Sequence, residues 1–225
     1  MNAPVEAGRL PQPDGPVGQA AETNPPAAAD LADVLDWLAA QFIRAPQREQ
    51  VHAARSVVGQ MLLREMGEVL GNEALMARLG QHLSEGTEEE VTVALQRRYT
   101  SLFEGVFPRR CALPYASAWQ GSGRLYDAPT VRMHELLQTL GMALAQADHE
   151  PPDHLAVQLA ALAHALRQAR WPMVRTLLAE MDWVAPFCRA MARLDGEGYY
   201  GVMAEVLPAA LVRVSTGYGT GQEER

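Results

Sequence analysis

Asp153 and His154 are the residues whose types best suit chemistry, because a carboxylate next to an imidazole can act as an acid–base pair. They belong to the run Glu150-Pro151-Pro152-Asp153-His154, which stands directly before the most apolar stretch of the chain, Leu155 to Leu166. Adjacent residues on a helix point in different directions, and neither a nucleophile motif nor an oxyanion site accompanies the pair. We therefore expect this junction to serve recognition and the chain not to be an enzyme.

Other site motifs are missing from the sequence. It contains no GxxxxGK[ST] phosphate loop, no GxGxxG, no HExxH and no GxSxG. His154 and His164 are ten positions apart, a spacing that suits no common helical metal pair, and His164 is best explained as a core histidine. Cys111 and Cys188 are 77 positions apart and form no CxxC pair. We expect no metal, no cofactor and no disulfide framework.

Composition narrows the class of partner and the compartment. The chain has 225 residues, of which 48% are hydrophobic, and a formal net charge of −8. A net negative charge disfavours nucleic acid as a partner and suits a basic peptide better. The two cysteines favour the reducing cytoplasm, and no stretch reaches the roughly 18 consecutive apolar residues that a membrane span needs.

The two ends of the sequence differ in composition from the rest. Residues 1–29 are rich in proline, glycine and alanine and lack the pattern of a secretory signal, so we expect a disordered tail. Residues 216–225 are expected to form a polar tail. Residues 30–215 then make up one compact helical domain, with a possible subdivision at a hinge near residues 148–154.

Hydrophobic periodicity predicts helices throughout this domain. We expect one from an Asp30 N-cap to a point before Pro46. Another is expected over residues 48–70, with an apolar face of Val58, Leu62, Met66 and Val69 at helical spacing and Gly71 as its stop. A shorter helix covers residues 73–83. Thr87 and Glu90 then form a capping box that begins the next helix.

The second half of the domain continues the helical pattern after one long loop. The later helices are expected over residues 129–146, 155–166, 172–181, 184–194 and 198–214. Runs of β-branched residues that alternate with polar ones do not occur, so no sheet is expected. The fold class is all-α, with about ten helices.

Residues 105–127 form the long loop, where helical periodicity fails and prolines, glycines and aromatic residues accumulate. Tyr115 and Trp119 allow two interpretations. Aromatic residues flanked by proline often pack a loop onto a helical body, or they can line a binding site together with the junction at residues 148–154. We expect the loop at residues 114–119 to lie against Asp153 and His154.

Three motifs in order resemble the TorD/DmsD family of redox-enzyme maturation chaperones, which is related more distantly to the NarJ chaperones. They are Tyr99-x-x-Leu102-Phe103, Pro114-Tyr115-Ala116-Ser117-Ala118-Trp119 and Glu150-Pro151-Pro152-Asp153-His154. Trp183-x-x-x-Phe187 and Tyr199-Tyr200 are similar to further aromatic positions of the family. The resemblance covers residues 30–215, and the third motif is the most specific.

The resemblance implies a cytoplasmic chaperone for a molybdopterin-containing oxidoreductase. Such a protein binds the twin-arginine signal peptide and the apo form of its client, and it delays export until the cofactor is inserted. The resemblance places signal-peptide binding at Glu150, Pro151, Asp153 and His154, and less specifically at Pro114, Tyr115, Ser117 and Trp119. Position 116 is alanine, where many relatives carry a larger or polar residue.

Two further functions stay open at this stage. The first is a NarJ-like assembly factor that binds the body of the client without strong dependence on a signal peptide. The second is a small all-α hydrolase or transferase that uses Asp153 and His154. The resemblance is compatible with either a monomer or a domain-swapped homodimer, and because the sequence has no phosphate loop, nucleotide binding is not expected.

Overall fold

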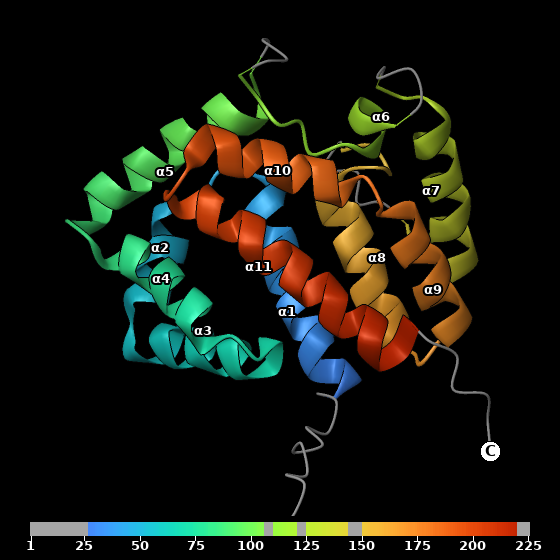
Figure 1. Cartoon of the computed structure of the whole chain (residues 1–225), viewed down its shortest axis with the longest axis horizontal. Helices are drawn as coiled ribbons and strands as arrows, with labels where there is room; N and C mark the ends of the chain where they lie inside the picture. Colours follow the sequence, from blue (N-terminus) through green and yellow to red (C-terminus); the bar gives the residue numbers. More distant parts are fainter. Residues whose placement is uncertain (1–26, 106–109, 121–124, 144–149, 220–225) are drawn as a thin grey trace, which may run out of the picture.

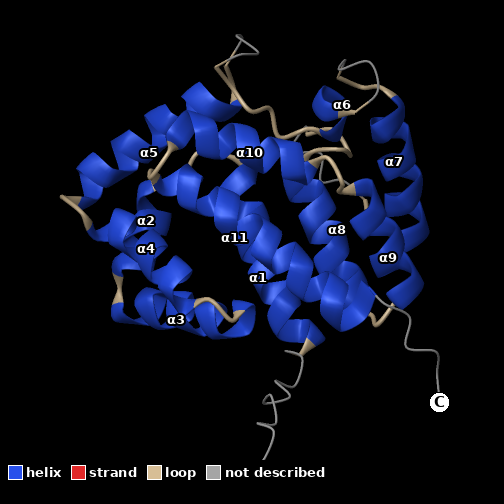
Figure 2. Cartoon of the chain, in the orientation of Figure 1, coloured by secondary structure: helices blue, strands red, loops and turns tan. Residues whose placement is uncertain are grey.

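The computed structural model describes residues 27–105, 110–120, 125–143 and 150–219. Within these ranges the chain is entirely helical apart from turns and one isolated antiparallel bridge between Tyr115 and His154, which confirms the all-α prediction (Figure 2). The bounds are α1 Ala28–Ile43, α2 Arg48–Arg55, α3 Val57–Leu70, α4 Glu73–Ser84, α5 Glu88–Phe103, α6 Ala116–Trp119, α7 Ala128–Leu140, α8 Leu155–Arg167, α9 Trp171–Glu180, α10 Val184–Asp195, α11 Tyr199–Val214 and a short π-helical turn Ser215–Gly219.

Helices α1, α8 and α11 form the centre of the molecule (Figure 1). Helices α2 to α5 lie on one side of this centre, and α6, α7 and α9 lie on the other. Each central helix contributes side chains without solvent exposure, such as Leu35 of α1, Leu159 of α8 and Leu207 of α11. None of the helices in the described part of the chain has the length and apolar character that crossing a membrane requires.

The aromatic residues of the predicted motifs pack together in the core. Phe103 contacts Tyr99 and Tyr200 with ring centroids 5.0 Å apart in both pairs, and Phe187 lies 5.7 Å from Trp183. All five of these residues are buried. These motif positions therefore serve packing between α5, α10 and α11.

The start of α1 differs from the prediction. Ala27 occupies the N-cap without a side-chain hydrogen bond, and Asp30 lies in the first turn, so the predicted Asp30 N-cap is wrong. A carboxylate in the first turn still stabilises a helix, because it faces the positive end of the helix dipole. The expected tails at residues 1–29 and 216–225 lie largely outside the described residues.

The helix predicted over residues 48–70 is divided in two at Ser56. The Ser56 hydroxyl accepts a hydrogen bond from the Gly59 amide at 3.0 Å and so caps α3. Gly71 ends α3 in the left-handed conformation, as predicted, with φ of 66°. The prediction of one continuous helix over residues 48–70 is therefore wrong, while its predicted end at Gly71 is confirmed.

The inward face of α3 also differs from the prediction. Val58 and Leu62 are 65% and 47% exposed, whereas Gly59 and Leu63 are buried. Two glycines explain the difference. A Cβ atom on Gly59 would lie 2.1 Å from the Ala53 carbonyl oxygen, and one on Gly67 would lie 2.8 Å from the Glu73 Cα. Only the glycine face can approach the neighbouring helices this closely, so Val58 and Leu62 remain accessible. Met66 and Val69 are half-buried and pack against the core, as the prediction requires.

The capping box is confirmed at the start of α5. The Thr87 hydroxyl accepts from the Glu90 amide at 3.2 Å, and the Glu90 carboxylate accepts from the Thr87 amide at 2.8 Å. Helix α7 ends at Leu140, since Gly141 adopts the left-handed conformation with φ of 73°. The predicted continuation past residue 140 is therefore wrong for residues 141–143, and its last part, residues 144–146, lies outside the described residues. Helix α8 begins at Leu155, as predicted.

Candidate functional site

The loop at residues 114–119 pairs with the junction that precedes α8. The Ala116 amide donates to the Asp153 carbonyl at 3.0 Å, and the Leu155 amide donates to the Pro114 carbonyl at 2.8 Å. These two bonds make the antiparallel bridge between Tyr115 and His154. The predicted contact between the loop and the junction is confirmed, and backbone pairing fixes their register.

Asp153 is completely buried and holds three segments together. One carboxylate oxygen accepts from the Ser117 amide of α6 at 2.9 Å, and the other accepts from the Thr130 hydroxyl of α7 at 2.8 Å. A buried carboxylate is costly unless such bonds compensate for its lost hydration. Asp153 therefore positions α6 and α7 against the start of α8 and presents no charge at the surface.

His154 is the N-cap of α8 and is 1% exposed. Its Nδ1 accepts from the Ala156 amide at 3.1 Å, and its ring packs edge-on against Tyr115 with centroids 4.9 Å apart. Burial lowers the pKa of His154 to about 4, and the neighbouring Asp153 carboxylate offsets part of that effect. The imidazole is neutral at pH 7, as an Nδ1 acceptor must be.

Tyr115 and Glu150 form the polar edge of the site toward solvent. Both are half-buried, and the Tyr115 hydroxyl donates to the Glu150 carboxylate at 2.9 Å. Burial, followed by the Glu150 charge, raises the pKa of the Tyr115 phenol well above its ordinary value. The phenol therefore remains protonated, and this pair presents a carboxylate on a rigid support.

Trp119 and the two prolines fix the shape of the loop and the junction. The Trp119 indole donates to the Leu113 carbonyl at 2.7 Å, and its ring meets Phe187 edge-on at 6.1 Å. Pro114 and Pro151 are buried, and the Pro151 carbonyl accepts from the His154 amide at 3.0 Å. The interpretation that the loop packs onto the helical body is therefore confirmed for Trp119.

Ser117 lies at the centre of this arrangement and is completely buried. Its amide bonds to Asp153, while its hydroxyl has no hydrogen-bond partner within the part of the chain that the structure describes. The Asp153 and His154 side chains bond to different partners, so they do not form an acid–base pair. Among the described residues, no three His, Cys, Asp or Glu side chains gather in a way that could hold a metal ion.

Two members of the site were not predicted. Thr130 binds Asp153 from α7, and a threonine in the first turn of a helix carries no specific sequence signal for that role. Gln158 is buried, and it accepts from the Trp183 indole at 3.1 Å. Its position as a polar residue within the most apolar helix could have indicated that Gln158 is buried and hydrogen-bonded.

A comparison with protein families agrees with this helical architecture, since one family model matches more than half of the chain. The chain belongs to the nitrate reductase delta subunit family, whose model matches residues 69–194. It is 27% identical over 193 residues to the chaperone protein TorD of Vibrio cholerae serotype O1 (Classical Ogawa 395), a match that covers 78% of this chain and 86% of that protein. It is 29% identical over 153 residues to the chaperone protein TorD of Photobacterium profundum, covering 61% and 69%.

The fold is shared with a solved structure. A crystal structure from Archaeoglobus fulgidus, of a protein provisionally assigned to redox enzyme maturation, matches with a TM-score of 0.51 and 20% identity, over 86% of this chain and 95% of the other. Together these matches confirm the resemblance to the TorD/DmsD family. The relatives carry the names of chaperones and not of enzymes, in agreement with the expectation that this chain is not an enzyme.

Proposed function

We propose that this protein is a maturation chaperone for a molybdopterin-containing oxidoreductase, and that it binds the twin-arginine signal peptide and the apo form of that client in the cytoplasm. The observation that carries the proposal is the similarity of most of the helical body to chaperones named TorD. The acidic composition supports it, because a net charge of −8 attracts a basic peptide.

The eight predicted site residues divide into two roles in this proposal. Glu150 and Tyr115 contact the peptide, because the Glu150 carboxylate lies at the polar edge of the site and can pair with a guanidinium. Trp119, which is half-buried, contributes an aromatic surface beside them. The buried residues keep that edge in shape through the bonds described above: Pro114, Ser117, Pro151, Asp153 and His154.

The proposal is tested with a synthetic peptide that carries two adjacent arginines followed by an apolar stretch of about 12 residues. Fluorescence anisotropy should give a dissociation constant in the micromolar range or lower. Replacing both arginines with glutamine should weaken binding about tenfold, since charge-assisted pairs are lost. Glu150→Gln should weaken binding of the arginine peptide, and Glu135→Gln, an exposed carboxylate on α7, should not.

The alternative function is an assembly factor that binds the body of its client with little use of a signal peptide. It predicts no binding of either peptide, together with formation of a complex with the cofactor-free client in size-exclusion chromatography. That pair of results would exclude signal-peptide binding and retain the role in maturation.

A further inference from the structure

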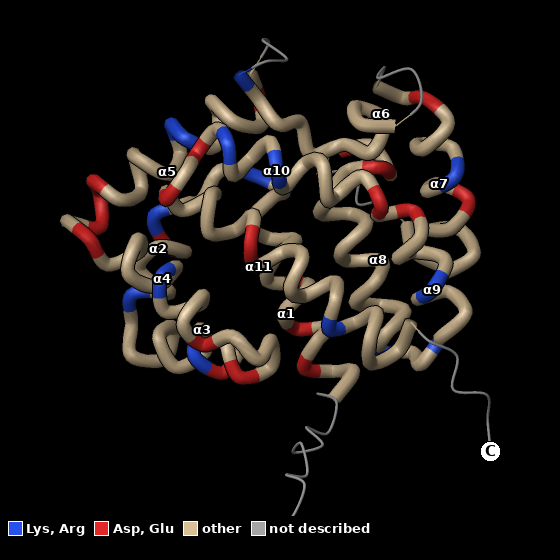
Figure 3. Tube along the Cα trace, in the orientation of Figure 1, with Lys and Arg blue, Asp and Glu red and all other residues tan. Residues whose placement is uncertain are grey.

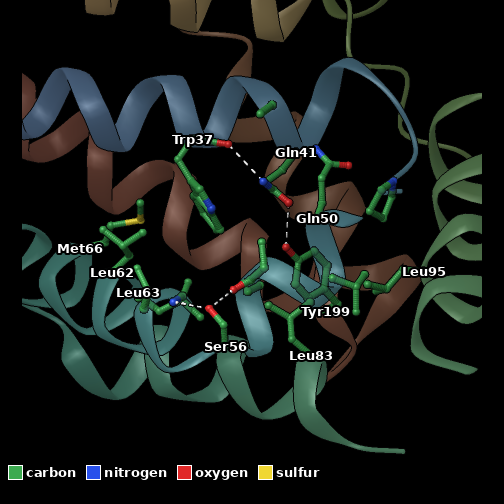
Figure 4. Close-up of a pocket in the computed structure, with 17 residues that line it drawn as sticks. Trp37, Gln41, Gln50, Ser56, Leu62, Leu63, Met66, Leu83, Leu95 and Tyr199 are labelled. Atoms are coloured by element: carbon green, nitrogen blue, oxygen red, sulfur yellow. Dashed lines mark hydrogen bonds between the residues drawn. The ribbon is translucent and has the colours of Figure 1, made fainter. Parts of the chain in front are cut away.

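A cavity of about 350 Å³ lies between α1, α2 and α3 (Figure 4). Helices α2 and α3 lie on the other side of the molecule from α6 and α7, which pack against the junction at residues 150–154 (Figure 1). Trp37 of α1 and Leu62 and Met66 of α3 point into the cavity, and Tyr199 of α11 closes its inner side. Its volume is at the lower end of the range for sites that bind small molecules or a few side chains. No part of the proposed function assigns a role to this cavity.

The lining of the cavity is apolar and uncharged. Among the described residues that form its wall, none is ionisable except Tyr199, and the polar side chains are Gln41, Gln50 and Ser56 besides that tyrosine. The Tyr199 hydroxyl donates to Gln41 at 3.0 Å, and Gln41 donates to the Trp37 carbonyl at 3.3 Å. The Gln50 side chain accepts from the Gln47 amide at 2.8 Å, and the Ser56 hydroxyl accepts from the Gly59 amide at 3.0 Å. Each of these polar side chains thus has a bond within the protein, and the remaining surface favours an apolar occupant.

The apolar surface continues outward from the cavity along α3. Val57, Val58, Met61 and Leu62 are 78%, 65%, 48% and 47% exposed. At 3.6 residues per turn these four side chains span about 140° of the helix circumference, which makes one broad apolar face. The close approach at Gly59 keeps this face outside, since the opposite face must contact α2. A contiguous apolar helix face beside an apolar cavity is typical of a site for a partner segment.

The charge next to the cavity indicates which partner segment fits. A second recess shares Leu95 and Tyr199 with the cavity and is bordered by Glu85, Glu90 and Asp195. Arg98 pairs with Asp195, and Arg55 donates to the Gly86 carbonyl at the edge of the recess at 2.8 Å, so Glu85 and Glu90 leave a small excess of negative charge. Acidic residues mark the start of α5 at the left edge of Figure 3, beside α2. An occupant with apolar side chains and a basic residue at one end complements both recesses.

We propose that this cavity and the exposed face of α3 bind the apolar segment of the client peptide, with a basic residue of that peptide directed to the recess beside Glu85. The inference rests on the proposed function, because it names a second contact surface for the same basic and apolar ligand. It places the apolar part of the ligand on α1 and α3 and a basic residue that follows this part beside Glu85, while the two arginines that precede it remain with Glu150 and Tyr115.

Three synthetic peptides test the inference on the full chain by fluorescence anisotropy. The first has two arginines, then about 12 apolar residues, then one lysine. The second has the same arginines followed by serine and glycine, and the third has two glutamines followed by the apolar stretch without the lysine. The double variant Val58→Gln/Leu62→Gln should bind the first peptide about tenfold more weakly and the second without change. Val212→Gln, equally exposed on α11, is the matched control and should change nothing.

The basic end of the ligand is tested with Glu85→Gln. This variant should weaken the first peptide about threefold and leave the third unchanged, since only the first carries charge. Equal losses for both peptides would refute the placement beside Glu85. Unchanged binding of the first peptide by the α3 double variant would overturn the whole inference, and a loss on Glu150→Gln in the same experiment would leave the proposed function standing. If the unsubstituted chain binds no peptide, this inference and the signal-peptide part of the proposed function are both wrong.

Discussion

The junction before α8 and the cavity beside α3 differ in burial: the polar side chains of the junction are buried and hydrogen-bonded, whereas apolar side chains beside the cavity are exposed to solvent. At the junction, Asp153 and His154 are buried and bonded, and their partners come from three segments of the chain. Beside α3, apolar side chains such as Val58 and Leu62 remain exposed. The most distinctive motif of this sequence, residues 150–154, therefore mainly stabilises the fold, whereas α3, which has no distinctive motif, carries more accessible apolar surface. Four changes test this difference, from the largest expected effect to the smallest.

Asp153→Ala should have the largest effect on stability. It leaves the Ser117 amide and the Thr130 hydroxyl without their acceptor and creates a small cavity, so the free energy of unfolding should fall by about 4 kcal/mol. Asp153→Asn retains one acceptor oxygen and should lose less. Urea denaturation followed by circular dichroism measures both, and a loss below about 1 kcal/mol for the alanine variant would refute the structural role.

His154 should make the protein sensitive to acid. Its pKa is about 4 in the folded protein, against an ordinary value of 6.5. As the pH falls, the unfolded chain therefore binds a proton before the folded protein does. The His154 contribution to the free energy of unfolding is fully present above pH 6.5, and about 3 kcal/mol of it is lost between pH 6.5 and 4.

His154→Asn should remove that part of the pH dependence. Asparagine can still accept from the Ala156 amide as an N-cap, so the variant should fold. Urea midpoints measured from pH 7.5 to 4 compare the two proteins. Parallel curves would mean that His154 is not the group that titrates.

Gly59→Ala tests why the apolar face of α3 remains outside. The added methyl would lie 2.1 Å from the Ala53 carbonyl oxygen, so α2 and α3 must separate, at a cost of about 2 kcal/mol. Gly80→Ala is the matched control, since its methyl meets the flexible end of Gln60 at 3.1 Å. Thermal unfolding of both variants should show a clear loss for the first and a small change for the second.

Leu62→Gln should have the smallest effect on stability, within about 0.5 kcal/mol, because the side chain is 47% exposed. The neighbouring Leu63→Gln places an amide at a position that is 5% exposed and should cost several times more. The two variants compare the loss of stability that the same substitution causes on the two faces of α3. Similar losses for both would mean that the Leu62 face is covered.

Sequence patterns predicted most of the secondary structure because its signals are local. The Thr87–Glu90 capping box and Gly71 act within a few residues of themselves. Contact between the 114–119 loop and Asp153 and His154 was also predicted, because both segments interrupt the helical pattern and carry prolines next to aromatic or polar residues.

What the sequence could not reveal depends on tertiary packing. Asp153 beside two prolines suggests a surface charge, and its burial follows from Thr130, which lies 23 positions earlier on another helix. Helix α3 has apolar residues on more than one face, and the choice between them is made by the space around Gly59 and Gly67. Neither constraint is visible in the local pattern.

The pairing between Pro114–Ala116 and Asp153–Leu155 also closes a loop within the chain. Helices α6 and α7 lie inside that loop, and Asp153 holds both of them. A segment closed in this way opens as one cooperative unit of local unfolding. Amide hydrogen exchange should therefore be similar at Ser117 and in the first turn of α7 and should increase at both places when Asp153 is replaced. A loss of client binding in such a variant would then report the release of two helices, and not the loss of a contact with the client.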